Sequence, residues 1–162
     1  MADTLRVVLV DDEDLVRSGL RLLLSNAPDI EVVAEASNGR DAVATVLDTQ
    51  PDVVLMDIRM PVMDGIEATA QLHSLAGARD IPVVMLTAFD TDEFILHALR
   101  AGAVGFLLKT TAPEALVASV RAAAQGQQQL SPKVLENLVG LADTPPQPEQ
   151  EMIQPSGLDE LS

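Results

Sequence analysis

Five short apolar runs, each followed by a stretch with helical spacing, constrain the fold of this chain more than any other feature. The runs cover residues 6–10, 31–34, 53–56, 82–86 and 104–108. They are mostly continuous rather than alternating, which is typical of strands that are covered on both faces. A parallel sheet with helices on each side buries such runs. The sequence therefore predicts an α/β fold in which five strands alternate with five helices.

The segments between the runs have the apolar spacing and the end signals of helices. The first two stripes consist of Leu15, Val16, Leu20, Leu23 and Leu24, and of Ala42, Val43, Val46 and Leu47. Gly102 is expected to end the fourth helix, and the residues from Thr111 to Glu114 predict a capping-box start for the fifth. The helix after Gly65 has the thinnest apolar face.

The chain is long enough for one well-buried domain with a tail. Its 162 residues, 48% of them hydrophobic, do not suffice for two domains of ordinary size. We expect a domain over residues 1–126, a polar connector with a short helix over 127–143, and a proline-containing linker over 144–162. This linker is expected to lead to a further domain that is absent from the sequence.

Composition excludes several classes of protein. The absence of cysteine excludes disulfides and thiolate ligands. Acidic residues at 11–14 interrupt the first apolar segment, which is therefore neither a secretory signal nor a membrane span, and we expect a soluble protein. A net charge of −15 makes this chain a poor binder of nucleic acid by itself and favours a cation as ligand.

Polar residues stand at the ends of four of the predicted strands. Asp11 and Asp12 follow the first run, Asp57 the third and Lys109 the fifth, and Thr87 follows the fourth. The carboxyl ends of parallel strands meet at one edge, where open α/β sheets bind their ligands. We therefore expect these five residues to form one pocket, whereas Glu13 should face away from it.

Three carboxylates in one pocket require positive charge. At about 4 Å and an effective dielectric constant near 20, they repel by roughly 4 kcal/mol per pair. Lys109 supplies one positive charge. We expect Mg²⁺ to supply the other two, because the pocket offers oxygen ligands and no histidine or sulfur.

Such a pocket suits phosphoryl transfer to a carboxylate. Asp57 would attack and form an acyl phosphate, with Mg²⁺ and Lys109 stabilising the transferred charge. Thr87 offers a hydroxyl to a phosphate oxygen. Phe106 is placed to respond if Thr87 moves, although an aromatic residue there is equally compatible with a simple core position.

These residues resemble the receiver domain of bacterial two-component response regulators. The resemblance covers residues 5–126 and depends on Asp11-Asp12, Asp57 with its following Pro/Gly turn, Thr87-Ala88 and Lys109. It implies a flavodoxin-like, doubly wound parallel sheet of order 2-1-3-4-5. It also implies phosphorylation of Asp57 by a sensor histidine kinase.

The resemblance further implies which residues bind the metal and transmit the signal. Mg²⁺ would be held by Asp57, Asp12, the backbone carbonyl of Arg59 and, less directly, Asp11. Thr87 and Phe106 would form a switch pair. The implied chemistry is limited to magnesium-dependent self-phosphorylation and autodephosphorylation, so that the chain is a signalling phosphoacceptor and not an enzyme.

Residues 38–42 and 130–132 resemble more specifically the NarL/LuxR-type (NarL/FixJ) subfamily, and residues 157–162 resemble the beginning of its output domain. The implied protein is a cytoplasmic transcription regulator that dimerises on phosphorylation. It binds DNA only through a C-terminal helix-turn-helix domain missing here.

Two positions depart from the family pattern, and the sequence also argues against two other classes of function. Lys109 is followed by Thr110 where many receivers have proline, and Phe106 stands where tyrosine is frequent. A haloacid-dehalogenase-type phosphatase needs a second acid two residues after its nucleophile, but position 59 is Arg. A phosphorylation-independent scaffold would lack the acids, the threonine or the lysine. Nucleotide-binding loops of the P-loop or G-x-G-x-x-G type are absent from the sequence.

Overall fold

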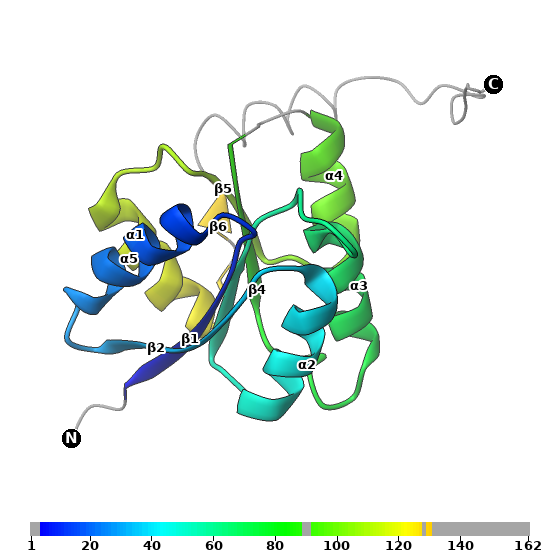
Figure 1. Ribbon diagram of the computed structural model, residues 1–162, viewed down its shortest axis with the longest axis horizontal. Helices are drawn as coiled ribbons and strands as arrows, with labels where there is room; N and C mark the ends of the chain where they lie inside the picture. The colour runs from blue at the N-terminus through cyan, green and yellow to red at the C-terminus, as the bar shows by residue number, and fades with distance from the viewer. Residues whose placement is uncertain (1–3, 89–91, 128, 131–162) are drawn as a thin grey trace.

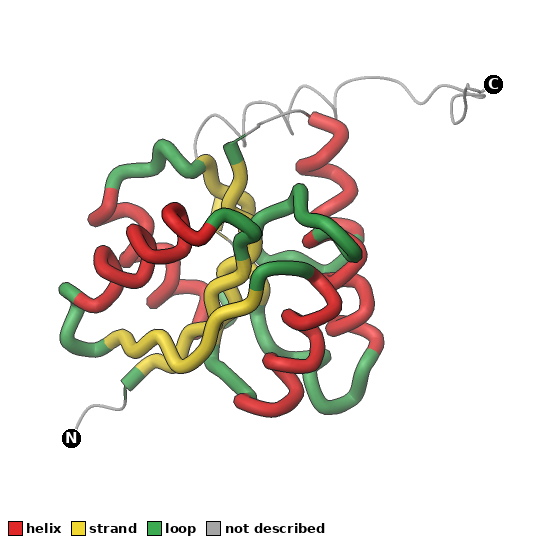
Figure 2. The backbone as a smooth tube through the Cα atoms, in the orientation of Figure 1, coloured by secondary structure: helices red, strands yellow, loops and turns green. Residues whose placement is uncertain are grey.

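A computed structural model describes residues 4–88, 92–127 and 129–130, without the side chains of 92–94 and 129–130. Within these residues, strands and helices alternate along the chain (Figures 1 and 2). They are β1 (Leu5–Val10), α1 (Asp14–Ser25), β2 (Ile30–Ala36), α2 (Gly39–Thr49), β3 (Val53–Met56), α3 (Gly65–Ser74), β4 (Val83–Thr87), α4 (Asp92–Arg100), β5 (Gly105–Leu108), α5 (Pro113–Ala124) and β6 (Gln129–Leu130). Of the expected connector with its short helix over 127–143, only residues 127, 129 and 130 are described. The expected linker over 144–162 lies outside the described residues.

The strands form one parallel sheet of order β2-β1-β3-β4-β5-β6. Its first five strands confirm the expected flavodoxin-like order 2-1-3-4-5. The short β6 is an addition, since the segment around Gln129 was expected to be an irregular connector. It pairs Gln129 with Gly105 and Leu130 with Phe106. Pairing along the free edge of β5 uses backbone groups, so it required no apolar run that the sequence could reveal.

Helices cover both faces of the sheet, α1 and α5 on one face and α2, α3 and α4 on the other (Figure 1). Alternate residues of a strand point to opposite faces. In β3, Val54 and Met56 accordingly pack in the core beneath α2, α3 and α4, and Val53 and Leu55 pack against α1 and α5. Strands buried in this way have no polar face, which is why the runs are continuous.

The helix ends follow the sequence signals in part. Asn38 and Asp64 cap α2 and α3 by accepting hydrogen bonds from backbone N–H groups three residues on. Gly102, at φ +113°, ends the turn after α4 as expected. The capping-box expectation at Thr111 was wrong. Helix α5 has Ala112 as its N-cap, without a side-chain cap bond, because Pro113 takes the first helical position.

The loop after β3 is held against the first residues of α2 and α3. The Gly65 amide donates to the Ile58 carbonyl at 2.7 Å, and a Cβ at Gly65 would meet the Asp57 carbonyl oxygen. The Gly39 amide donates to the Met63 carbonyl at 2.8 Å, and a side chain there would also clash with backbone. These two glycines allow close packing of the loop that follows Asp57.

The same loop contains a strained turn. Val62 has φ of +71°, and the Met63 amide donates to the Pro61 carbonyl at 2.8 Å, which closes a γ-turn around Val62. A β-branched residue in this conformation costs of the order of 1–3 kcal/mol. Strain of this size persists because the hydrogen bonds of Gly39 and Gly65 fix the loop on both sides.

No helix in the described part of the chain is long and apolar enough to cross a membrane.

Candidate functional site

The carboxyl ends of β1, β3, β4 and β5 surround a cavity of about 240 Å³. Its lining residues are Asp12, Glu13, Asp57, Arg59, Thr87, Ala88 and Lys109. Because the strands are parallel and adjacent, residues tens of positions apart in sequence lie side by side. The structure thus brings together the residues that the sequence selected, and Asp11 lies buried next to them, 1% exposed.

Lys109 stands between the acidic residues. Its Nζ lies 2.7 Å from Asp11 Oδ2, 3.3 Å from Asp57 Oδ2 and 3.8 Å from Glu13 Oε1. Its backbone amide donates to the Thr87 carbonyl at 2.7 Å, which fixes the end of β5 against β4. Burial alone would lower the pKa of Lys109, but the hydrogen bond to Asp11 and the charges of Asp57 and Asp11 raise it. The ammonium group is therefore protonated across the physiological range.

Asp57 is 8% exposed and directly follows β3. Its Oδ1 accepts a hydrogen bond from the Ile58 amide at 2.9 Å, and its Oδ2 faces Lys109. Burial raises the pKa of Asp57 to about 6, and the charge of Asp11 adds to this, although Lys109 and the Ile58 amide act in the opposite direction. At neutral pH the carboxylate is ionised but poorly solvated, which leaves it in need of further positive charge.

Both carboxylate oxygens of Asp11 have a partner. Oδ1 accepts from the Glu13 amide at 2.9 Å. Oδ2 is fully buried and lies 2.7 Å from the Lys109 ammonium nitrogen. A carboxylate oxygen has about two lone-pair sites, so Oδ2 can accept from a water molecule bound to a cation in addition to Lys109.

One oxygen from each of Asp11, Asp12 and Asp57 can lie within 4.8 Å of the others. Three carboxylates with one exposed member, Asp12, offer hard oxygen ligands and leave room for water. Mg²⁺ prefers this combination because it retains several waters and takes one or two carboxylates. The residues present therefore fit the magnesium ion expected from the sequence. Arg59, whose carbonyl was the fourth expected ligand, also lines the cavity.

The two expected switch residues occupy different environments. Thr87 ends β4 at the cavity wall and is buried. Phe106 lies on the neighbouring strand β5, is 0% exposed and packs in the core formed with α2, α3 and α4. The pairing of Met85 with Phe106 and of Thr87 with Leu108 places the aromatic residue two positions further from the cavity than the threonine.

Two residues near the site differ from expectation or were missed. Glu13 was expected to face away from the pocket, but it lines the cavity and approaches Lys109. The Glu13 amide donates to Asp11 Oδ1 at 2.9 Å, so the backbone of Glu13 lies close to the site. Arg17 was not selected by any motif, although its guanidinium donates to the Asp11 carbonyl at 2.7 Å. This contact is visible only in the folded structure, because the apolar spacing of α1 does not single out Arg17.

Comparison with known proteins identifies the family. The model of the response regulator receiver domain matches residues 7–121, which is most of the chain. Curated relatives include the transcriptional regulatory proteins YxjL and LiaR of Bacillus subtilis, which are 46% and 42% identical over 125 and 130 residues. The matches cover 77% and 80% of this chain but 56% and 61% of the relatives. The chain thus spans little more than half the length of these relatives.

Solved structures agree with the fold. A two-component response regulator of the LuxR family from Aurantimonas sp. SI85-9A1 has a TM-score of 0.81 and 34% identity, over 88% of this chain and 100% of that one. The receiver domain of the response regulator NarL from Mycobacterium tuberculosis has a TM-score of 0.72 and 35% identity, over 77% and 99%. Both carry the subfamily names that the sequence resemblance suggested.

The raised pKa of Asp57 predicts a pH-dependent gain in stability for Asp57→Asn. The pKa of the carboxyl is about 6 in the folded protein and 3.8 as its ordinary value. Between these values the folded state holds the proton that the unfolded chain releases, so ionisation destabilises the fold as pH rises through this window. Asn releases no proton. Its advantage over wild type should grow from pH 4 to pH 6 and then stay constant, by roughly 1–3 kcal/mol at about 1.4 kcal/mol per unit.

Urea unfolding of both proteins in EDTA at pH 4, 5, 6 and 7.5 measures this difference. EDTA removes divalent ions that would offset the charge of Asp57. A difference that does not change with pH would show that the carboxyl has an ordinary pKa and that burial does not govern its charge.

Proposed function

The chain belongs to the family of response regulator receiver domains, and from this premise we propose that Asp57 accepts a phosphoryl group from a sensor histidine kinase. One observation carries the proposal. Asp57 is buried at the end of the central strand β3, lines the cavity and contacts Lys109. Asp11 does not line the cavity, and Asp12 and Glu13, which do, are exposed.

The geometry supports attack by Asp57 on phosphorus. A carboxylate oxygen forms the new O–P bond while the bond from phosphorus to the donor nitrogen, or to the acyl oxygen of a small phosphodonor, breaks. The ionised carboxylate needs no base, because it has no proton to lose at neutral pH. Lys109 Nζ, 3.3 Å from Asp57 Oδ2, would then contact a phosphoryl oxygen and reduce the charge that accumulates in the acyl phosphate.

Magnesium completes the charge balance of the proposed site. Asp11, Asp12, Asp57 and the Arg59 carbonyl would hold it, directly or through water, and when bound it supplies positive charge to the phosphoryl oxygens. The three carboxylates, which each place an oxygen within 4.8 Å of the others, support this assignment. Arg59, two residues after the nucleophile, is not an acid, so the site lacks the general acid of a haloacid-dehalogenase-type phosphatase.

We further propose that the domain serves in a cytoplasmic transcription regulator of greater length. The support comes from the relatives, which are named as transcriptional regulators and extend beyond the matched region. A net charge of −15 makes this chain unsuited to DNA by itself. DNA contact through a helix-turn-helix output domain and phosphorylation-dependent homodimerisation are therefore proposed for the whole protein.

The phosphoacceptor assignment is tested by labelling. Incubation of the wild type with acetyl phosphate and Mg²⁺ should add one base-labile phosphoryl group. Mass spectrometry should detect it as a gain of about 80 Da, the mass of HPO₃. Asp57→Asn should remove the label because an amide is not a nucleophile under these conditions. Asp48→Asn, an exposed position on α2, is the matched control and should label normally. Full labelling of Asp57→Asn would place the acceptor elsewhere.

Signal transmission is proposed to pass through Thr87 and Phe106. If the Thr87 hydroxyl bonds a phosphoryl oxygen, β4 shifts toward the site and the core beside Phe106 changes. One charge-assisted hydrogen bond contributes about 1.5–3 kcal/mol, enough to change a two-state population by roughly tenfold to a hundredfold. The buried position of Phe106 means that the ring responds through packing and not through the cavity.

NMR of the Phe106 ring, with and without beryllofluoride at Asp57, tests the switch. The ring signals should shift in the wild type and in Thr87→Ser, which keeps the hydroxyl, and shift much less in Thr87→Ala. An equal response in all three proteins would leave Phe106 as a core residue only.

A further inference from the structure

Arg17, in the first turns of α1, connects three parts of the chain next to the site. Its Nη1 donates to the Asp11 carbonyl at 2.7 Å, its Nε to Glu35 Oε1 at 2.9 Å and its Nη2 to Asp14 Oδ1 at 2.7 Å. The side chain is 16% exposed. A planar guanidinium can bind three acceptors in fixed directions, which a lysine cannot.

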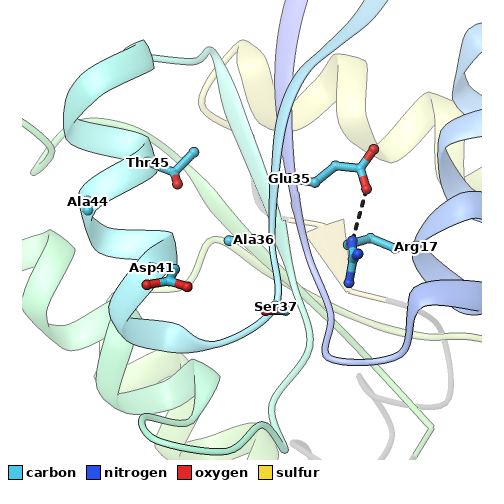
Figure 3. A pocket seen from close by; sticks show the side chains of 7 residues that line it. All are labelled: Arg17, Glu35, Ala36, Ser37, Asp41, Ala44 and Thr45. Carbon is cyan, nitrogen blue, oxygen red and sulfur yellow. Dashed lines mark hydrogen bonds and ion pairs between the residues drawn. The ribbon is translucent and has the colours of Figure 1, made fainter.

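The three acceptors lie on different elements. Asp11 follows β1, Asp14 begins α1 and Glu35 lies on β2. Figure 3 shows the Arg17 guanidinium and the Glu35 carboxylate pointing toward each other, with Asp41 and Thr45 of α2 across a pocket of about 330 Å³. The Asp11 amide donates to the Ala36 carbonyl at 3.1 Å. The backbone of Asp11 is therefore held at both its N–H and its C=O.

The peptide bond between Asp11 and Asp12 includes the carbonyl that Arg17 binds. This peptide plane contains the Cα of Asp12, so its orientation determines where the Asp12 side chain begins. Mg²⁺ requires nearly octahedral ligands at about 2.0–2.1 Å, so small displacements of a carboxylate weaken binding. A turn between a strand and a helix has no ladder of its own to fix this orientation.

We propose that Arg17 is a positioning residue for the magnesium site, which it orders by holding the Asp11 carbonyl against Glu35 of β2. This inference depends on the proposed function, because it assumes that the Asp11, Asp12 and Asp57 carboxylates bind Mg²⁺. Arg17 does not line the cavity of those carboxylates and acts only through the backbone of Asp11.

Charge and position predict opposite effects, which makes the proposal testable. Removing a positive charge near three carboxylates should strengthen Mg²⁺ binding slightly by Coulomb's law. Loss of the Asp11 anchor should weaken it. Arg21 is the matched control, since its Nη1 binds the same Glu35 at 2.8 Å, but the structure gives it no bond to Asp11.

The experiment is a Mg²⁺ titration of the full chain, followed by isothermal calorimetry and by amide shifts. Wild type, Arg17→Met, Arg17→Lys and Arg21→Met are compared, with Asp12→Ala as a variant that lacks a ligand. We expect both Arg17 variants to bind about tenfold more weakly, the size typical when a partner of a metal ligand is lost. Arg21→Met should bind as the wild type or slightly more tightly. Arg17→Lys keeps the charge, so its loss of affinity would identify position as the cause.

The outcomes separate this inference from the proposed function. If wild type binds Mg²⁺ and both Arg17 variants match it, or if Arg21→Met weakens binding as much as they do, the positioning role is wrong while the metal site stands. If wild type does not bind Mg²⁺ at all, the proposed metal site itself fails. Urea unfolding and circular dichroism confirm that each variant is folded at the temperature of the titration.

Discussion

The ion pairs of Lys109 with Asp11 and Asp57 are the interaction on which the site depends. Two carboxylates this close would repel by about 4 kcal/mol at an effective dielectric constant near 20, and both are largely removed from water. One ammonium within 2.7 Å and 3.3 Å of them offsets part of this cost. It does not offset all of it, because the pKa of Asp57 remains raised by burial. The residual negative charge is what the proposed Mg²⁺ would balance.

The fold produces this juxtaposition through the parallel sheet. Strands β1, β3, β4 and β5 end at one edge, and the amides of Gly39 and Gly65 donate to carbonyls of the loop after Asp57 at close approach. The backbone of Asp11, at the end of β1, is attached to β2 through Arg17 and Glu35. The carboxylates are thus held from two sides before any ligand binds, which reduces the reorganisation that a metal ion or phosphoryl group requires.

Much of this could be predicted from sequence, for definite physical reasons. Continuous apolar runs indicate strands covered on both faces, and polar residues at their ends must then meet, so the placement of Asp57, Thr87 and Lys109 followed from topology alone. The other features of the structure leave no periodic pattern in the sequence. Strand β6 forms through backbone pairing, and the backbone of Glu13 lies close to the site because its amide donates to Asp11. The contact of Arg17 with a carbonyl likewise requires knowledge of the tertiary structure.

The most direct test of the account is the pKa of the Asp57 carboxyl in the wild type and in Lys109→Met, measured by carbon-detected NMR without divalent ions. We expect a pKa of about 6 in the wild type and a clearly higher value in Lys109→Met, where burial and the charge of Asp11 act without opposition. Asp29, which is paired with Arg121 at 2.8 Å and has a pKa lowered by that hydrogen bond, is an internal control and should not change. An unchanged or lower pKa for Asp57 in Lys109→Met would contradict the claim that Lys109 holds the charges of this site together.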